Sequence, residues 1–259
     1  MKDRMLSEFL TLNVFSYFLV FTRVGATIMF FPGIASRMVN LRIRLLLAIA
    51  VSVVITPAVF PLLPSRPSNA LALSILLIGE ATIGIFLGVI AQIMMAALNF
   101  AGNIMSYQVG LASALINDPV MEQQSGIIAN FLTNLAVVLV FVSGLYAMLF
   151  HAIADSYYVL APGQPVPIED FTLAVSRSVA DAVRVGLQLA IPLQVSGLVF
   201  FSGLGVLSRL MPNLQIFFVA MPVQIMLGLS VLMIVLPAMM LAFLRFFEDH
   251  LSPFLASGM

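Results

Sequence analysis

Two charged residues stand inside long apolar stretches of the sequence, and their chemistry needs explaining first. Glu80 lies in an apolar run over residues 71–100, and Arg23 lies in another over residues 9–31. A carboxylate at membrane depth either pairs with another group or lines a proton or ion path. Arg23 either pairs between helices or extends its charge to the membrane surface. The two could pair with each other, which the sequence alone leaves open.

Small and polar residues recur on the Glu80 side of a predicted helix. They follow one another every three or four positions, and at 100° per residue they share one face. They are Glu80, Gly84, Gly88, Gln92, Met95, Asn99 and Gly102. Because Gly84 and Gly88 form a GxxxG pair, another helix can approach closely there. The candidates for helix packing are Arg23, Glu80, Gly84, Gly88 and Gln92.

Motifs for catalysis are missing from the sequence. Lys2 is its only lysine, so no phosphate-binding GxxxxGK[ST] loop exists, and there is no GxSxG elbow. The absence of cysteine excludes thiolate metal sites, and His151 and His250 are too far apart in the chain to suggest a metal centre. His151, Asp155 and Ser156 are close in sequence, but three neighbours at a helix end do not make a catalytic triad. We therefore predict no enzyme, cofactor or metal.

Composition places the chain in lipid, inside a large apolar assembly, or both. The 259 residues are 62% hydrophobic and 8% charged, with zero net charge and a mean hydropathy of +1.14. Soluble domains carry about 25% charged residues, and no basic patch suits nucleic acid. The apolar runs cover residues 9–31, 45–63, 71–100, 127–153, 183–207 and 214–247. Each has about the length that a membrane-crossing helix needs.

These runs predict helices, because backbone groups in hydrocarbon must bond within their own segment. Pro192, Pro222 and Pro237 lie inside two of the runs, and residues 71–100 are too long for one straight crossing. We expect an all-α protein, integral to the membrane or assembled in it, with long, kinked helices and helical hairpins.

Ala101–Gly126 separates the third and fourth runs and differs from both. It contains several glycines and Pro119, and its charges are Asp118 and Glu122. The segment is too polar for lipid and too apolar for an ordinary exposed loop. Non-helical backbone at membrane depth is tolerated where protein buries it or where it lines a cavity. We expect this segment to be non-helical and functional.

An ordered set of short motifs resembles the FliR family of flagellar biosynthesis proteins, related to the T component of virulence type III secretion systems. The motifs are Arg23-Val-Gly25-Ala26, Pro32, Arg42-Ile-Arg44-Leu-Leu-Leu-Ala48, Gly79 to Gly88, Gln108-Val-Gly110-Leu111, Asn117-Asp118-Pro119, Ala154-Asp155-Ser156, Pro212-Asn-Leu-Gln215-Ile-Phe217, Pro222 and Gly228. The resemblance extends from about Leu12 to Arg245. Asn40 and Leu145 depart from it, where relatives often have proline and histidine.

The resemblance implies a core, channel-forming subunit of the flagellar (type III) protein export gate. Unfolded flagellar proteins would pass through this gate across the bacterial inner membrane, at the flagellar basal body. The implied partners are P-type and Q-type gate subunits, the B-type export-switch protein, the exported substrates and membrane lipid. Energy would come from other components.

The resemblance also implies an internal organisation. Residues 1–259 form one helical gate subunit, with a P-like part over 1–182 and a Q-like hairpin and C-terminus over 183–259. The hairpin itself would cover 183–247 and turn at Arg209–Leu214. The family's channel plug maps onto Ser106–Glu122. The plug candidates are Ser106, Gln108, Gly110, Leu111, Leu115, Ile116, Asp118, Pro119, Met121 and Glu122.

Two other functions compete with an export gate. A self-sufficient secondary transporter would have Glu80 and Arg23 at its site, but such transporters show paired repeats with discontinuous helices, and no convincing repeat is visible here. An intramembrane enzyme would need a nucleophile and base or a metal set. The oligomeric mass of the purified chain would separate a gate subunit from a transporter.

Overall fold

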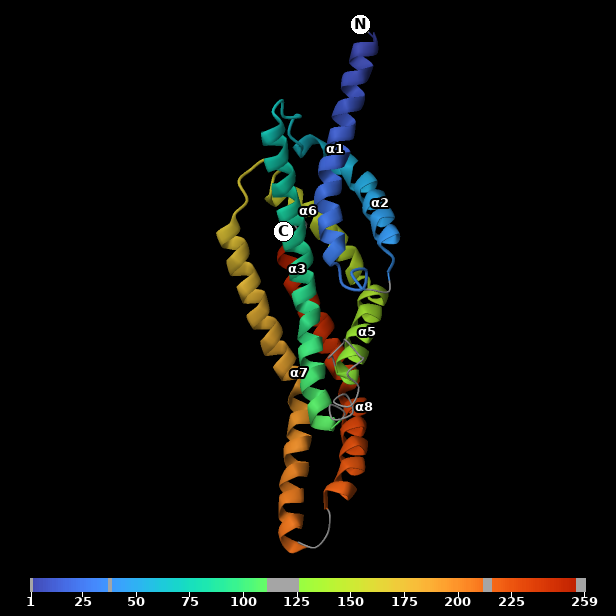
Figure 1. Cartoon of the computed structure of the whole chain (residues 1–259), viewed down its shortest axis with the longest axis vertical. Helices are drawn as coiled ribbons and strands as arrows, with labels where there is room; N and C mark the ends of the chain where they lie inside the picture. The colour runs from blue at the N-terminus through green and yellow to red at the C-terminus, as the bar shows by residue number, and fades with distance from the viewer. Residues whose placement is uncertain (1, 37–38, 111–125, 212–215, 255–259) are drawn as a thin grey trace. The chain divides into compact units, whose positions relative to one another are not determined.

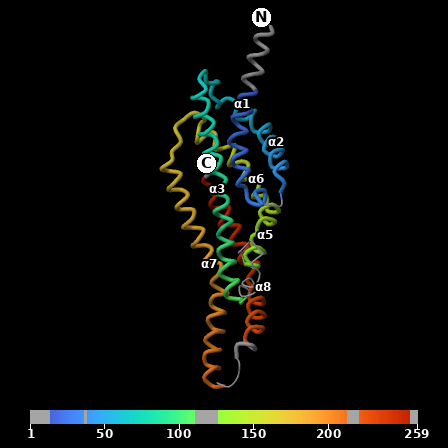
Figure 2. The backbone as a smooth tube through the Cα atoms, in the orientation of Figure 1, coloured from blue at the N-terminus to red at the C-terminus, as the bar shows by residue number. Residues whose placement is uncertain are grey.

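The computed structural model describes residues 2–36, 39–110, 126–211 and 216–254, and every regular element among them is helical (Figures 1 and 2). The all-α prediction is confirmed. The elements are α1 (Lys2–Phe30), α2 (Leu41–Val59), the 3-10 helix η1 (Phe60–Leu62), α3 (Ala70–Val109), α5 (Ile127–Val142), α6 (Leu145–Val159), α7 (Ile168–Leu210), α8 (Ile216–Leu251) and the 3-10 helix η2 (Ser252–Phe254).

Local sequence signals explain where several helices begin. Asn40 is the N-cap of α2, and its side-chain oxygen accepts a hydrogen bond from the backbone N–H of Arg42 at 3.1 Å. Asn69 accepts in the same way from Leu71 at the start of α3, at 3.0 Å. Glu169 and Asp170 lie in the first turn of α7, where negative charge is favourable.

Among the described residues, four helices are long and apolar enough to cross a membrane: Leu41–Leu62, Ala70–Val109, Ile168–Leu210 and Ala220–Leu251. Helix α3 has 40 residues, so it is about 60 Å long, twice the thickness of a bilayer's hydrocarbon core. The prolines do not end their helices, since Pro192 lies within α7 and both Pro222 and Pro237 lie within α8. The predicted membrane character and long helices are confirmed.

The apolar run over 127–153 is not one straight helix. Helices α5 and α6 meet at a 74° bend across Ser143 and Gly144. Gly144 has a φ of +79°, in the left-handed region that side chains rarely adopt. A single glycine in the run therefore turns the chain sharply, which a count of apolar residues does not reveal.

Helix extends into two stretches that lie between apolar runs of the sequence. We expected Ala101–Gly126 to be non-helical, but α3 continues through Ala101 to Val109. Residues 111–125 lie outside the described part. The polar stretch over 154–182 is also mostly helical, because α6 ends at Val159 and α7 begins at Ile168. In the described part of both stretches, polar side chains such as Ser106 and Ser156 find partners while their backbone remains helical.

The chain forms two compact units, each assembled from separate segments. Unit 1 comprises Met1–Ile93, Phe141–Ser178 and Glu248–Met259, and unit 2 comprises Met94–Val140 and Val179–Phe247. In unit 1, α1 packs on α2. The core of this unit includes stacked rings of Phe86 and Phe171, with centroids 3.9 Å apart. The division into P-like and Q-like parts remains a prediction.

Candidate functional site

Arg23 and Glu80 form a buried ion pair in unit 1. The Arg23 Nε lies 2.7 Å from the Glu80 Oε2, and its Nη2 lies 3.0 Å from the Oε1. The side chains are 0% and 1% exposed. This two-point geometry, with both carboxylate oxygens engaged, is the strongest arrangement available to an arginine and a carboxylate.

Other N–H groups of the Arg23 guanidinium donate to α6 and to the residue that follows it. Arg23 donates from Nη1 to the Ser156 hydroxyl at 3.0 Å, and from Nη2 to the Leu160 carbonyl at 2.9 Å. The Tyr157 ring lies 3.9 Å from the guanidinium carbon, within cation–π distance. Arg23 thus joins α1 to α3 and to the end of α6.

The GxxxG pair on α3 explains how α1 comes so close. A Cβ placed on Gly84 would lie 2.3 Å from the carbonyl oxygen of Arg23. On Gly88 it would lie 2.8 Å from the Thr27 carbonyl oxygen and 2.6 Å from the Cβ of Phe30. Only glycine fits at these separations. Two of the packing candidates therefore face α1 directly, one and two turns beyond the ion pair, whereas Gln92 is exposed.

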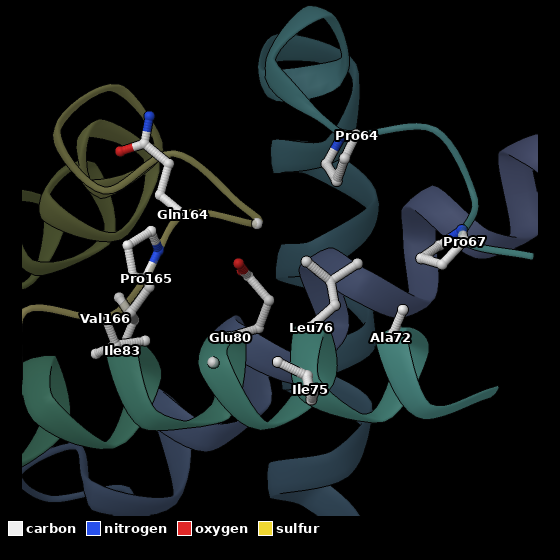
Figure 3. A pocket seen from close by; sticks show the side chains of 12 residues that line it. Pro64, Pro67, Ala72, Ile75, Leu76, Glu80, Ile83, Gln164, Pro165 and Val166 are labelled. Atoms are coloured by element: carbon white, nitrogen blue, oxygen red, sulfur yellow. The ribbon is translucent and has the colours of Figure 1, made fainter. Parts of the chain in front are cut away.

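A cavity of about 400 Å³ opens beside Glu80, between the segment after α2 and the loop before α7 (Figure 3). Its lining is mostly apolar: Pro64, Pro67, Ala72, Ile75, Leu76, Gly79, Ile83, Gly163, Gln164, Pro165 and Val166, with Glu80 itself. Figure 3 shows the Glu80 carboxylate among these segments. Because Arg23 holds both carboxylate oxygens, the cavity borders a neutralised pair.

The sequence neighbours His151, Asp155 and Ser156 do not make a catalytic group. The Ser156 hydroxyl accepts from Arg23 and donates to the Ile153 carbonyl at 2.7 Å, so the pair and its own helix use it. His151 is exposed on α6. Within the described residues no cluster of three His, Cys, Asp or Glu could hold a metal ion.

A second set of polar contacts, in unit 2, holds the last turns of α3. Asn103 accepts a hydrogen bond from the backbone N–H of Gly126 at 2.9 Å, and Ser106 bonds to the Gly102 carbonyl at 2.8 Å. A Cβ on Gly102 would lie 2.3 Å from the Cα of Ala129. Helix α5 therefore starts in close contact with α3.

The plug candidates divide between described and undescribed residues. Ser106 is buried on α3, Gln108 lies in its last turn, and Gly110 follows the helix with a φ of +81°. The other candidates lie outside the described residues: Leu111, Leu115, Ile116, Asp118, Pro119, Met121 and Glu122.

Comparison with known proteins assigns the family. The model of "Bacterial export proteins, family 1" matches residues 14–250. The chain belongs to this family. The export protein is 37% identical over 214 residues to the flagellar biosynthetic protein FliR of Caulobacter vibrioides, covering 83% of this chain and 85% of the relative. The Escherichia coli FliR protein is 31% identical over 227 residues, covering 85% and 84%.

The virulence branch also matches. The Yop proteins translocation protein T of Yersinia pestis is 24% identical to this export protein over 225 residues, covering 85% of each chain. The resemblance to the FliR family is therefore confirmed. The export protein is a membrane-embedded component of a flagellar or type III export apparatus.

Sequence reasoning missed three partners of Arg23 in this export protein. In the sequence, Ser156 stands out only in a motif and beside His151 and Asp155, and nothing singles out Tyr157 or the Leu160 carbonyl. Their signal was weak: Ala154-Asp155-Ser156 belongs to the ordered motif set, but nothing in its spacing points to residue 23.

Proposed function

We propose that this chain is a core, channel-forming subunit of the flagellar export gate in the bacterial inner membrane, at the flagellar basal body. It passes unfolded flagellar proteins and has no catalytic activity of its own. Family membership carries this proposal. It is supported by the neutral Arg23–Glu80 pair, whose guanidinium also donates to Ser156 and to the Leu160 carbonyl, an arrangement that suits a structural part better than a reacting site.

Exposed apolar surface supports assembly with other chains. In the most apolar 18-residue stretches of α7 and α8, the buried share is 22% and 28%. Large side chains such as Leu198 and Ile234 are 68% and 79% exposed. Gly203 and Gly205 lie within α7 with open space around them. Helical glycines cost about 1 kcal/mol relative to alanine, and a close neighbouring helix would justify that cost.

The partners that we propose are the P-type and Q-type gate subunits on these helices, the B-type export-switch protein, and unfolded substrates in the channel. Lipid would cover apolar surface that protein leaves free.

We expect the chain to accumulate as a stable particle only when P-type and Q-type subunits are expressed with it. Alone, its apolar helices lack protein neighbours and should aggregate or be degraded. Detergent extraction followed by size-exclusion chromatography, with and without the partners, measures this. A stable, monodisperse monomer of the lone chain would contradict the proposal.

The secondary-transporter alternative gains little support. A transport carboxylate must bind and release a cation, and Glu80 has both oxygens bonded to a guanidinium that Ser156 and Leu160 also hold. Releasing the carboxylate would break both hydrogen bonds of the ion pair at once. The cavity beside Glu80 is the feature that a transporter would share.

We further propose that Ser106–Glu122 closes the resting channel. A pore wide enough for an unfolded chain would leak ions unless something excludes water from it, as apolar constrictions do in other channels. Beyond Val109, which is buried at the end of α3, the segment offers Leu111, Leu115, Ile116, Val120 and Met121 for this purpose. Its glycines and Pro119 permit turns. An ordinary buried connector is the alternative.

Deleting part of Gly110–Ile116 should raise ion leakage severalfold while the gate still assembles. The leak is measured as tracer-ion flux in vesicles that contain the co-expressed gate. A variant with Leu111, Leu115 and Ile116 changed to asparagine keeps the length and should also leak, because polar side chains no longer exclude water. If both variants assemble and the membrane stays tight, this segment is not the closure.

A further inference from the structure

We propose that Gln224 of α8 is a positioning residue that caps the C-terminal end of α3 and so sets where the chain leaves that helix. The inference rests on the closure role proposed for Ser106–Glu122, because the cap stands at the base of that segment. It concerns described residues of unit 2 alone.

A helix end leaves carbonyl groups without partners inside the helix, and these need a donor from elsewhere. Helix α3 ends at Val109, and Gly110 follows in the left-handed conformation that commonly terminates helices. The Gly110 N–H bonds back to the Tyr107 carbonyl at 3.1 Å. Gln224 donates from Nε2 to the Gln108 carbonyl at 2.8 Å, so the cap comes from a residue 116 positions away.

Two glycines make room for this contact. A Cβ on Gly228 would lie 2.7 Å from Val109 Cγ2, and Gly228 is one turn beyond Gln224 on the same face of α8. A Cβ on Gly197 of α7 would lie 1.7 Å from the side-chain nitrogen Nε2 of Gln108. The last turn of α3 is therefore fitted against glycines on two helices.

The fit leaves little free space. The cavity among Gln108, Val109, Gly197, Gln224 and Gly228 measures about 10 Å³, roughly the minimum for one water molecule. Val109 is 1% exposed. A contact this closely packed leaves no room for a ligand. Its effect is to fix the direction in which the chain leaves α3 at residue 110.

The test replaces Gln224 by methionine, which has a similar length and no donor. In the co-expressed gate, Gln224→Met should raise tracer-ion leakage about fivefold, the population shift expected for losing one net hydrogen bond, with assembly unchanged. Gln188→Met, the same change at an exposed position of α7, is the control and should leave the leak at its wild-type level.

A disulfide provides a rescue that a general loss of stability would not show. The natural chain has no cysteine, and a Cβ at Gly228 would lie 3.1 Å from that of Val109, a few tenths of an ångström below the usual span of a disulfide. Adding Val109→Cys and Gly228→Cys to Gln224→Met should restore a tight membrane when oxidised. Reduction should bring the leak back.

The outcomes separate the two proposals. If the Gly110–Ile116 deletion leaks but Gln224→Met stays tight, the cap is wrong and the closure stands. If Gln224→Met leaks and the oxidised disulfide does not restore tightness, positioning by Gln224 is wrong. If the deletion itself stays tight, the closure fails. The cap is then tested by proteolysis near residue 110, which Gln224→Met should accelerate and the oxidised disulfide should slow.

Discussion

Replacing Glu80 by alanine is expected to remove most of the assembled protein from the membrane. The change leaves the Arg23 guanidinium at 0% exposure with no opposing charge. Breaking a buried pair by removing one partner costs about 3–5 kcal/mol. Ser156, Tyr157 and the Leu160 carbonyl would remain, but they bring dipoles and a ring rather than a charge. The amount of chain recovered with its co-expressed partners measures the effect.

Matched variants separate the effect of losing the ion pair from the effect of losing side-chain volume. Arg23→Met with Glu80→Met removes both charges, and such apolar replacements of buried pairs are often neutral, so assembly should largely return. Glu248→Ala removes an exposed carboxylate from α8 and should change little. Wild-type recovery of the Glu80→Ala protein would show that the pair does not hold unit 1 together.

Glu80→Gln tests the proton-path alternative within the same set. Glutamine keeps the shape and one acceptor oxygen, so assembly should fall less than with alanine and export by the assembled gate should continue. Loss of export from a fully assembled gate, measured as secreted flagellar protein, would favour proton transfer at Glu80 over a structural role.

The sequence predicted parts of this site one residue at a time. A charge inside an apolar run must be paired, so both Arg23 and Glu80 stood out, and Gly84 and Gly88 marked a close helix contact. The pairing itself joins residues 57 positions apart. A single sequence does not reveal a contact between residues so far apart in the chain, because that contact depends on how the helices pack.

The predicted boundaries failed where side chains satisfy each other without unwinding the backbone. The glycines, Pro119 and two acids made Ala101–Gly126 look non-helical, yet α3 continues to Val109, where Asn103 bonds Gly126 and Ser106 bonds the Gly102 carbonyl. Conversely, the apolar run over 127–153 hid the bend at Gly144, because hydropathy reports burial and not direction. A glycine there was the available signal.

Gly84→Ala should damage the protein, although the same change at Gly79 on the same helix should be harmless. At residue 84 the new Cβ would meet the Arg23 carbonyl oxygen at 2.3 Å and the Cβ of Ala26 at 2.8 Å. Backbone cannot yield as a flexible side chain can, so α1 must move away. Overpacking of this kind typically costs about 1–3 kcal/mol, and the displacement would also strain the Arg23–Glu80 pair one turn away.

At residue 79 the added Cβ would lie 3.6 Å from Val166 Cγ2, an ordinary contact. Alanine there should be neutral or stabilise α3 by up to about 1 kcal/mol, because glycine is a poor helix former. Alanine is therefore expected to destabilise the protein at residue 84 and to leave its stability unchanged or raise it at residue 79 of the same helix. Thermal unfolding of the purified gate compares the two variants. It is monitored as loss of the complex on heating. Equal melting of the two variants would mean that α1 does not depend on the close approach at Gly84.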